Sequence, residues 1–314
     1  MPTEHTVPLN AFKSHSLCAA LAAAFCLLIT VGLQAQTLYV SDYSTGLITA
    51  LPLGGGSSTF ATAPGGSQPE GMAFDSAGNL YVALAATNTI WKYTPGGVGS
   101  LFGTTLITHP TGLAFDSAGN LYASMTNNGT IEKFGPGGGT STVFATGFGS
   151  VLGLAIDGAN NVYGANYAAS PGGSIFRVGP GGGAATAIAS TLNYPNSLAF
   201  DGAGNLYATI GGTTGINEYA AGTWTPAVFY SPIAGGPTAI VFDPGSATFF
   251  VSMINTGQIE RYALNGTDLG VFAGGFVSAS SLAISAVPEP ATYAALCGLG
   301  ALGFTAWRKR RITV

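Results

Sequence analysis

The chain has 314 residues, of which only 7% are charged and 47% are hydrophobic, and 48 are glycine. Soluble domains carry about 25% charged residues, and the apolar residues here recur periodically, so tight turns joining buried strands are expected. Residues 37–286 contain eleven acidic residues, four basic residues and no cysteine. This composition excludes a basic nucleic-acid-binding surface, a disulfide framework and a thiolate metal site in that region.

Residues 1–36 are predicted to be a secretory signal peptide. An uncharged apolar run, residues 17–33, follows a polar stretch that contains Lys13, and Ala35 supplies a small residue for cleavage. The run is longer than the usual ~7–15 apolar residues of a signal peptide. An uncleaved membrane anchor is therefore the alternative.

A repeat fills residues 37–286. The motif G/S-L-A-F-D and its variants recur at intervals of 41 to 44 residues, and the residues that precede each copy are Glu70, Thr111, Leu152, Asn196, Thr238 and Ser280. This period equals one four-stranded blade of a β-propeller. The predicted strands of the first copy are the motif itself, NLYVA (79–83) and TIWKY (89–93), and later copies show a fourth strand such as STVFAT (141–146).

The link between the first two strands of each copy is predicted to be a tight turn. DSAGN (75–79 and 116–120) places glycine at the left-handed position of a type I turn, and DGANN (157–161) places Asn160 there. The repeated aspartates are interpreted as turn formers, with calcium binding as the alternative. Small first-strand residues, such as Ala73 and Ala155, suit the crowded axis of a propeller.

The last copy is incomplete, because SLAIS (281–285) is followed by Val287-Pro288-Glu289-Pro290 instead of a second strand. TLYVS (37–41), GLITALPL (46–53) and SSTFAT (57–62) supply the missing second, third and fourth strands. The fold class is therefore predicted to be all-β, a six-bladed β-propeller over residues 37–286 whose N- and C-terminal strands share one blade.

Residues 287–314 form a third predicted segment. After Val287, Pro288, Glu289 and Pro290 come seventeen residues without a charge, 291–307, and then Arg308, Lys309, Arg310 and Arg311. Seventeen helical residues cover about 26 Å, enough for a transmembrane helix. The basic cluster would remain cytoplasmic and leave residues 37–286 outside. A buried core helix is the alternative.

Two resemblances to known families follow from these motifs. P-x-G-L-A-F-D-x-x-G-N-L-Y-V with N-T-I-x-K-Y resembles the NHL repeat over about 37–285, which implies a propeller and is compatible with binding scaffolds and enzymes. Residues 287–311 resemble the PEP-CTERM sorting signal. That resemblance implies recognition by an exosortase, an inner-membrane intermediate, and then the cell surface or extracellular matrix of a Gram-negative-type bacterium, often beside exopolysaccharide.

A site at the mouth of the central channel is expected only in part. Gluconolactonase-like propellers, which this chain resembles distantly, hold a divalent metal there with one Glu, two Asn and one Asp. Glu70 and Asn196 match, whereas Leu152 and Thr238 stand where the other ligands belong. Two ligands are too few for a hard cation, so no metal and no cofactor are predicted. Related lyases use a histidine, for which His109 is the candidate.

Aromatic residues near the mouth are candidates for stacking on sugar rings. Tyr167 lies in the longest predicted loop on that face, NYAASPGG (166–173), and Tyr43, Tyr194 and Trp224 are further candidates. The sequence predicts a non-catalytic binding or structural module of the cell envelope or extracellular matrix, with an exopolysaccharide or envelope protein as partner. The alternative is a lactonase-like hydrolase or lyase.

Overall fold

A computed structural model describes residues 36–168, 171–211, 215–230 and 235–285. The predicted signal peptide and sorting segment lie outside these residues. The described residues belong to one compact unit, residues 36–286. Among them no helix is long and apolar enough to cross a membrane, and the predicted transmembrane helix 291–307 falls in a part that is not described.

Six sheets, each built around four antiparallel strands, make up this unit, and we number them as blades 1 to 6. Blade 1 contains β4 (Pro69–Phe74), β5 (Leu80–Leu84), β6 (Thr89–Tyr93) and β7 (Gly99–Thr104). Blade 2 contains β8 (Pro110–Phe115), β9 (Leu121–Met125), β10 (Thr130–Phe134) and β12 (Thr142–Ala145). Blade 3 contains β13 (Val151–Ile156), β14 (Val162–Asn166), β15 (Gly173–Val178) and β16 (Thr186–Leu192).

The remaining blades follow the same order. Blade 4 contains β17 (Pro195–Phe200), β18 (Leu206–Ile210), β19 (Gly215–Tyr219) and β20 (Pro226–Tyr230). Blade 5 contains β21 (Pro237–Asp243), β22 (Thr248–Met253), β23 (Gln258–Ala263) and β24 (Asp268–Gly274). Blade 6 contains β25 (Ala279–Ile284), β1 (Thr37–Asp42), β2 (Leu47–Pro52) and β3 (Ser58–Thr62).

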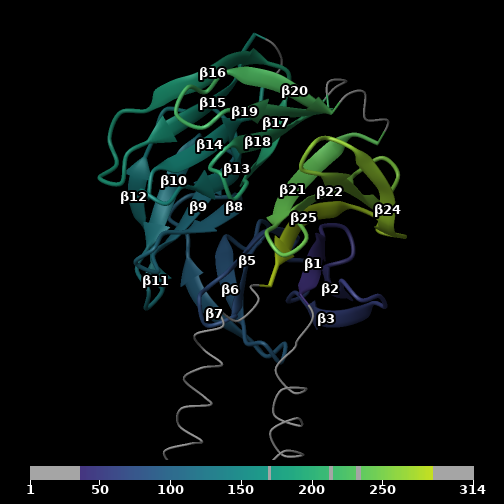
Figure 1. The fold of residues 1–314 in the computed structure, drawn as a ribbon. Coiled ribbons are helices and arrows are strands. Elements are labelled where there is room, and N and C mark those ends of the chain that lie inside the picture. Colours follow the sequence, from purple (N-terminus) through teal and green to yellow (C-terminus); the bar gives the residue numbers. More distant parts are fainter. Residues whose placement is uncertain (1–35, 169–170, 212–214, 231–234, 286–314) are drawn as a thin grey trace, which may run out of the picture. The chain divides into compact units, whose positions relative to one another are not determined.

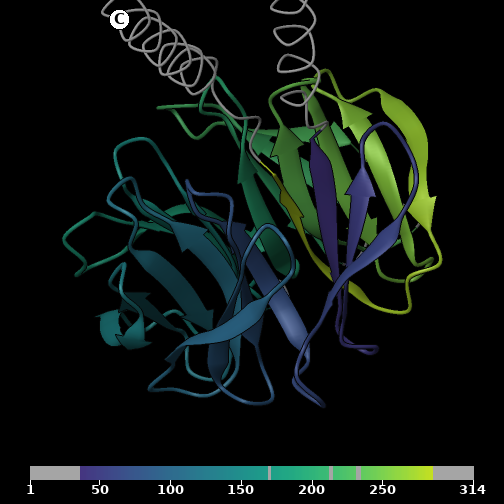
Figure 2. The ribbon, with the colours of Figure 1, turned by 90° about the horizontal axis from the view of Figure 1, so that it is seen from below.

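The ring closes as the sequence predicts. In blade 6 the C-terminal strand β25 pairs with the N-terminal strand β1, in a register that sets Leu38 opposite Ile284 and Asp42 opposite Ala279. First strands of neighbouring blades contact one another in the cyclic order β4, β8, β13, β17, β21, β25 and back to β4. Figures 1 and 2 show the blades side by side around this axis. The six-bladed propeller with a shared blade is confirmed.

The core lies between blades, which explains why the strands are apolar on both faces. Every residue of β5, β9 and β18 is buried. One core cluster joins Tyr81 and Ile90 of blade 1 to Leu113 and Leu121 of blade 2. One element was not predicted: β11 (Gly139–Thr140) pairs in parallel with β7 and adds a fifth strand to the sheet of blade 1. This pairing covers the outer edge of blade 1.

The turns that link first and second strands have the predicted chemistry. The Asp75 carboxylate accepts hydrogen bonds from the backbone N–H groups of Ala77 and Asn79, from the Asn79 side chain at 2.8 Å and from the Tyr81 hydroxyl at 3.2 Å. The same pattern recurs at Asp116, Asp157 and Asp201. Asn160 has a φ of 62°, the left-handed conformation expected of it. The interpretation as turn formers is confirmed.

Candidate functional site

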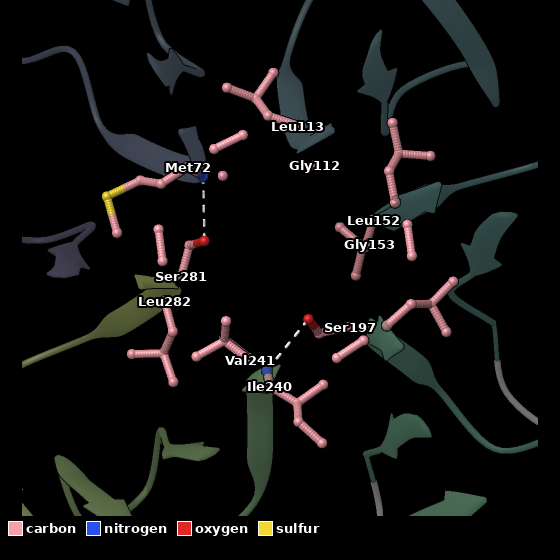
Figure 3. A pocket seen from close by; sticks show the side chains of 18 of the residues that line it. Met72, Gly112, Leu113, Leu152, Gly153, Ser197, Ile240, Val241, Ser281 and Leu282 are labelled. Atoms are coloured by element: carbon pink, nitrogen blue, oxygen red, sulfur yellow. Dashed lines mark hydrogen bonds between the residues drawn. The ribbon is translucent and has the colours of Figure 1, made fainter. Parts of the chain in front are cut away.

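The first strands enclose a central channel with a cavity of about 410 Å³. Figure 3 shows lining residues from these strands arranged around the opening, among them Met72, Gly112, Leu152, Ser197 and Ile240. All six residues aligned at the start of the repeats line this channel, each as the second residue of its first strand: Glu70, Thr111, Leu152, Asn196, Thr238 and Ser280. We call this end of the channel the mouth.

Three of the six positions carry hydroxyls that are used to join blades. Thr111 Oγ1 donates to the carbonyl oxygen of Val151 at 3.2 Å, and Thr238 Oγ1 donates to that of Ala279 at 3.3 Å. Ser280 Oγ donates to the carbonyl oxygen of Pro69 at 2.9 Å. Each bond crosses from one blade to the next. These hydroxyls satisfy backbone groups where the bulged first strands leave them unpaired.

Second strands contribute another set of hydroxyl groups to these hydrogen-bonded joints between neighbouring blades. Ser124 Oγ accepts from the N–H of Gly112 in its own blade at 2.8 Å and donates to the carbonyl oxygen of Leu152 in the next blade at 2.6 Å. Thr209 forms the same bridge between Ser197 and Thr238. Ser41 Oγ donates to the carbonyl oxygen of Glu70 at 2.8 Å. None of these hydroxyl residues was predicted, although the recurrence of Ser or Thr near the end of the second-strand motif is a signal of their role.

Close backbone approach at the axis requires glycine in three blades. A Cβ on Gly71, Gly112 or Gly153 would lie 1.9 to 2.5 Å from a carbonyl oxygen of the next blade. The tightest packing is thus two residues before the predicted alanines. In blades 4 and 6 the equivalent residues are serines, whose Oγ atoms accept hydrogen bonds from the N–H groups of Ile240 and Met72, as Figure 3 shows.

Glu70 and Asn196 differ from the other mouth residues because their side chains have no partner among the described residues. They lie on blades 1 and 4, which face each other across a six-membered ring. Burial in the channel wall raises the pKa of the Glu70 carboxyl to about 7. The mouth therefore presents one carboxyl group with a pKa near 7 and one carboxamide, neither of them hydrogen-bonded to a described residue.

His109 and Tyr167 lie on loops at the mouth end but are not among the residues that line the channel. His109 has a φ of 68°, and its backbone N–H donates to Asn88 Oδ1 at 2.9 Å. The structure therefore does not unite His109 with Glu70 in one site. Tyr167 is 38% exposed, and its ring lies 4.9 Å from that of Tyr194, with 41° between the planes.

Two other aromatic candidates are placed apart from this pair. Tyr43 follows β1 at the mouth end, in blade 6. Trp224 lies in the turn between β19 and β20, at the opposite end of its blade, and packs 5.3 Å from Tyr163. Trp224 therefore belongs to the packing between blades 3 and 4, and of the four aromatic candidates Tyr167, Tyr194 and Tyr43 lie at the mouth end.

The mouth does not fit the divalent metal of gluconolactonase-like propellers. Calcium requires six to eight oxygen ligands, whereas here Leu152 offers none and the hydroxyls of Thr111, Thr238 and Ser280 are bound to backbone carbonyls. Within the described ranges no three His, Cys, Asp or Glu residues come together as metal ligands. Glu70 and Asn196 alone cannot complete such a site.

Family comparisons identify two segments of the chain. Residues 286–311 match the PEP-CTERM protein-sorting motif. The chain carries a PEP-CTERM sorting signal. This signal makes the protein an exported, surface-sorted substrate of exosortase machinery. Residues 56–86, which include Glu70, match the model of strictosidine synthase-like proteins, N-terminal part. No curated protein matches the chain.

Solved structures share the fold at low sequence identity. A structure of a nidogen/laminin complex matches with a TM-score of 0.73 and 18% identity, over 81% of this chain and 100% of that one. The calcium-binding protein regucalcin of Agrobacterium tumefaciens matches with a TM-score of 0.57 and 16% identity, over 74% of this chain and 76% of that one. A streptogramin B lyase matches with a TM-score of 0.60 and 15% identity, over 76% of this chain and 80% of that one. These likenesses, together with the six sheets around one axis, show that the chain has a β-propeller fold.

Proposed function

We propose that this exported propeller is a non-catalytic binding or structural module of the cell envelope or extracellular matrix of a Gram-negative-type bacterium. The observation that carries the proposal is the pair of unpartnered side chains, Glu70 and Asn196, on opposite walls of the mouth. A few unpaired polar groups in a cavity whose other polar groups already have hydrogen-bond partners are typical of ligand sites. An exopolysaccharide or an envelope protein is the partner that we propose.

The tyrosine pair, with Tyr167 exposed and Tyr194 half-buried, favours a carbohydrate over a small apolar ligand. Tyr167 and Tyr194 lie in loops on the mouth face, and Tyr194 is two residues from Asn196. Aromatic rings stack on the apolar faces of sugars while amide and carboxyl groups accept and donate hydrogen bonds to their hydroxyls. An extended polymer lying across the mouth would contact the tyrosine pair and the channel residues together.

A polysaccharide-binding experiment tests this proposal. The full chain is titrated with oligosaccharides of alginate, chitosan and dextran by calorimetry, together with the variants Glu70→Gln, Asn196→Ala and Tyr167→Ala. We expect binding to one of these polymers that weakens at least tenfold in each variant. Asn128→Ala, an exposed residue on the mouth face away from the channel, is the control. Failure to bind all three, or binding that the channel variants leave unchanged, would contradict a carbohydrate site at the mouth.

A second candidate function is a lactonase-like hydrolase or lyase. The raised pKa of Glu70 favours it, because a carboxyl group that titrates near pH 7 is suited to general acid–base catalysis. Two of the structures similar to this chain are named for regucalcin and a streptogramin B lyase. In this role Glu70 would transfer a proton to or from the substrate, and Asn196 would orient the substrate through its carboxamide.

Turnover assays distinguish the two candidates. Purified protein is incubated with five- and six-membered lactones and with a cyclic depsipeptide, and ring opening is followed by mass spectrometry. The binding-module proposal predicts no turnover above that of Glu70→Gln. Ring opening that is abolished by Glu70→Gln and that follows a pKa near 7 would instead establish the enzyme.

A further inference from the structure

Both ends of the propeller leave it from the face opposite the mouth. Thr37 and Ser285 are joined there by two hydrogen bonds of 3.0 Å, one from Thr37 N–H to Ser285 Oγ and one from Ser285 N–H to the Thr37 carbonyl oxygen. The opposite ends of the same strands, Asp42 and Ala279, pair at the mouth. Figure 1 shows β1 and β25 side by side. We call the face that carries Thr37 and Ser285 the exit face.

The exit face is tied closely to the predicted membrane segments. Only residues 286–290 separate Ser285 from the apolar run 291–307, and only residues 34–36 separate the apolar run 17–33 from Thr37. Five residues span at most about 18 Å even when fully extended. The mouth lies a further strand length away, about 20 Å for six residues. Covalent connection therefore limits how far Thr37 and Ser285 can lie from the membrane, and it places no such limit on the mouth.

The side chains of the exit face are compatible with this position. The end of the channel opposite the mouth is lined by half-buried apolar residues, Phe74, Ile156, Phe200, Phe242 and Ile284. The bases of the described region are spread singly over four blades. Lys92 and Lys133 lie 3.6 and 3.7 Å from Asp75 and Asp116. No described basic cluster competes with the chain ends in orienting the propeller on anionic lipid.

We propose that the propeller is displayed with its exit face toward the membrane and its mouth outward while the C-terminal segment is attached. The exit face then meets the lipid surface, and Glu70, Asn196 and Tyr167 are accessible to partners outside the cell. This inference does not depend on which ligand the mouth binds.

Fluorescence quenching at matched positions tests the orientation. The only native cysteines, Cys18, Cys26 and Cys297, are replaced by alanine in the full chain, which is then reconstituted in phosphatidylcholine vesicles. Single cysteines are labelled with bimane at exposed turn positions of the exit face, Ala77→Cys and Ala118→Cys, and of the mouth face, Ala86→Cys and Asn128→Cys. Blades 1 and 2 thus each have one labelling position on the exit face and one on the mouth face. Lipids with a spin-labelled headgroup act as the quencher.

We expect quenching several-fold stronger at residues 77 and 118 than at residues 86 and 128. The contrast should persist in 1 M NaCl, where electrostatic screening acts within about 3 Å, because the tether is covalent. Equal quenching at both faces, stronger quenching at the mouth, or a contrast that disappears in salt would overturn the proposal. A full chain that does not associate with the vesicles would remove its premise and overturn it as well.

Discussion

The hydroxyl of Ser41 donates a 2.8 Å hydrogen bond to the carbonyl oxygen of Glu70, the residue with the free carboxyl group at the mouth. Ser41 lies on β1 of the blade that closes the ring, and Glu70 lies on β4 of blade 1. Ser41 Oγ also lies 3.0 Å from Ser280 Oγ, which in turn binds the carbonyl oxygen of Pro69. The joint that closes the propeller therefore also fixes the backbone of its candidate binding residue.

Ser41→Ala is expected to lower the free energy of unfolding by about 1–3 kcal/mol, because the Glu70 carbonyl oxygen loses the hydrogen bond from the fully buried Ser41 hydroxyl. Urea denaturation measures this loss. Ser44→Ala is the matched control, since Ser44 is exposed in the loop after β1 and should cost less than about 0.5 kcal/mol. Equal stability of the two variants would show that the joint contributes nothing.

Gly112→Ala is expected to destabilise the propeller by more than about 3 kcal/mol. The new Cβ would lie 2.2 Å from the Leu152 carbonyl oxygen, and both groups belong to strand backbones that cannot move without opening the axis. Gly137→Ala is the control because an added Cβ there meets no atom within 4 Å. Thermal unfolding followed by circular dichroism compares the two, and a Gly112 variant as stable as the control would refute the close packing.

The raised pKa of Glu70 predicts a specific pH dependence of stability. Between its ordinary pKa of about 4.5 and its folded pKa of about 7, the folded state binds more protons than the unfolded state. Stability should therefore fall, by about 1–3 kcal/mol, as the pH rises through this window. Glu70→Gln should remove the fall. Hydrogen bonds lower the pKa of Asp75 and Asp116. These two carboxyl groups therefore affect the free energy of unfolding only at lower pH, where protonating them lowers stability.

Denaturant titrations at pH 4.5, 5.5, 6.5 and 7.5 on both proteins measure the difference. If the two curves run parallel across this range, Glu70 titrates at its ordinary pKa. The argument for acid–base chemistry at the mouth would then fail with it.

Glu218→Lys is expected to stabilise the protein. Lys92, Lys133 and Arg177 each pair across the strand with a tyrosine, whereas in blade 4 Glu218 pairs with Tyr207. Burial and the charges of Glu218 and Asp201 raise the pKa of Tyr207, so two carboxylates lie near one phenol. A lysine would form with buried Asp201 the ion pair that is found in blades 1 and 2, and the free energy of unfolding should rise by about 0.2–1 kcal/mol. Glu218→Gln should gain less, and the lysine variant's gain should shrink in salt.

The sequence predicted the fold through features that act locally. The repeat period, the four short strands and the Asp75-type turns each depend on residues that are neighbours in the chain, so they can be recognised without a structure. The pairing of SLAIS with TLYVS followed because an unpaired strand at each end left only one way to close the ring. The register of β25 against β1 confirms that inference.

The mouth was predictable only in part. Glu70 and Asn196 were predicted because Glu and Asn side chains carry oxygen atoms that can bind a ligand, and residue type is known from the sequence alone. Both residues line the channel. The roles of Thr111 and Ser280 were not found, because they depend on how far neighbouring blades approach and on the bulge in each first strand. His109 lies on the loop before β8 at the mouth end but is not among the residues that line the channel, so its role stays a prediction.

The pairing of β25 with β1 also has a consequence for biosynthesis. These strands are separated by more than 230 residues in the chain, so the ring cannot close until nearly the whole propeller has been synthesised. An exported chain that emerges N-terminus first must therefore cross the membrane before its last blade exists. The sorting motif begins two residues after Ile284, so the apolar run 291–307, which is predicted to span the membrane, is the next part to arrive. Folding and arrest at the membrane are thus expected to occur almost together.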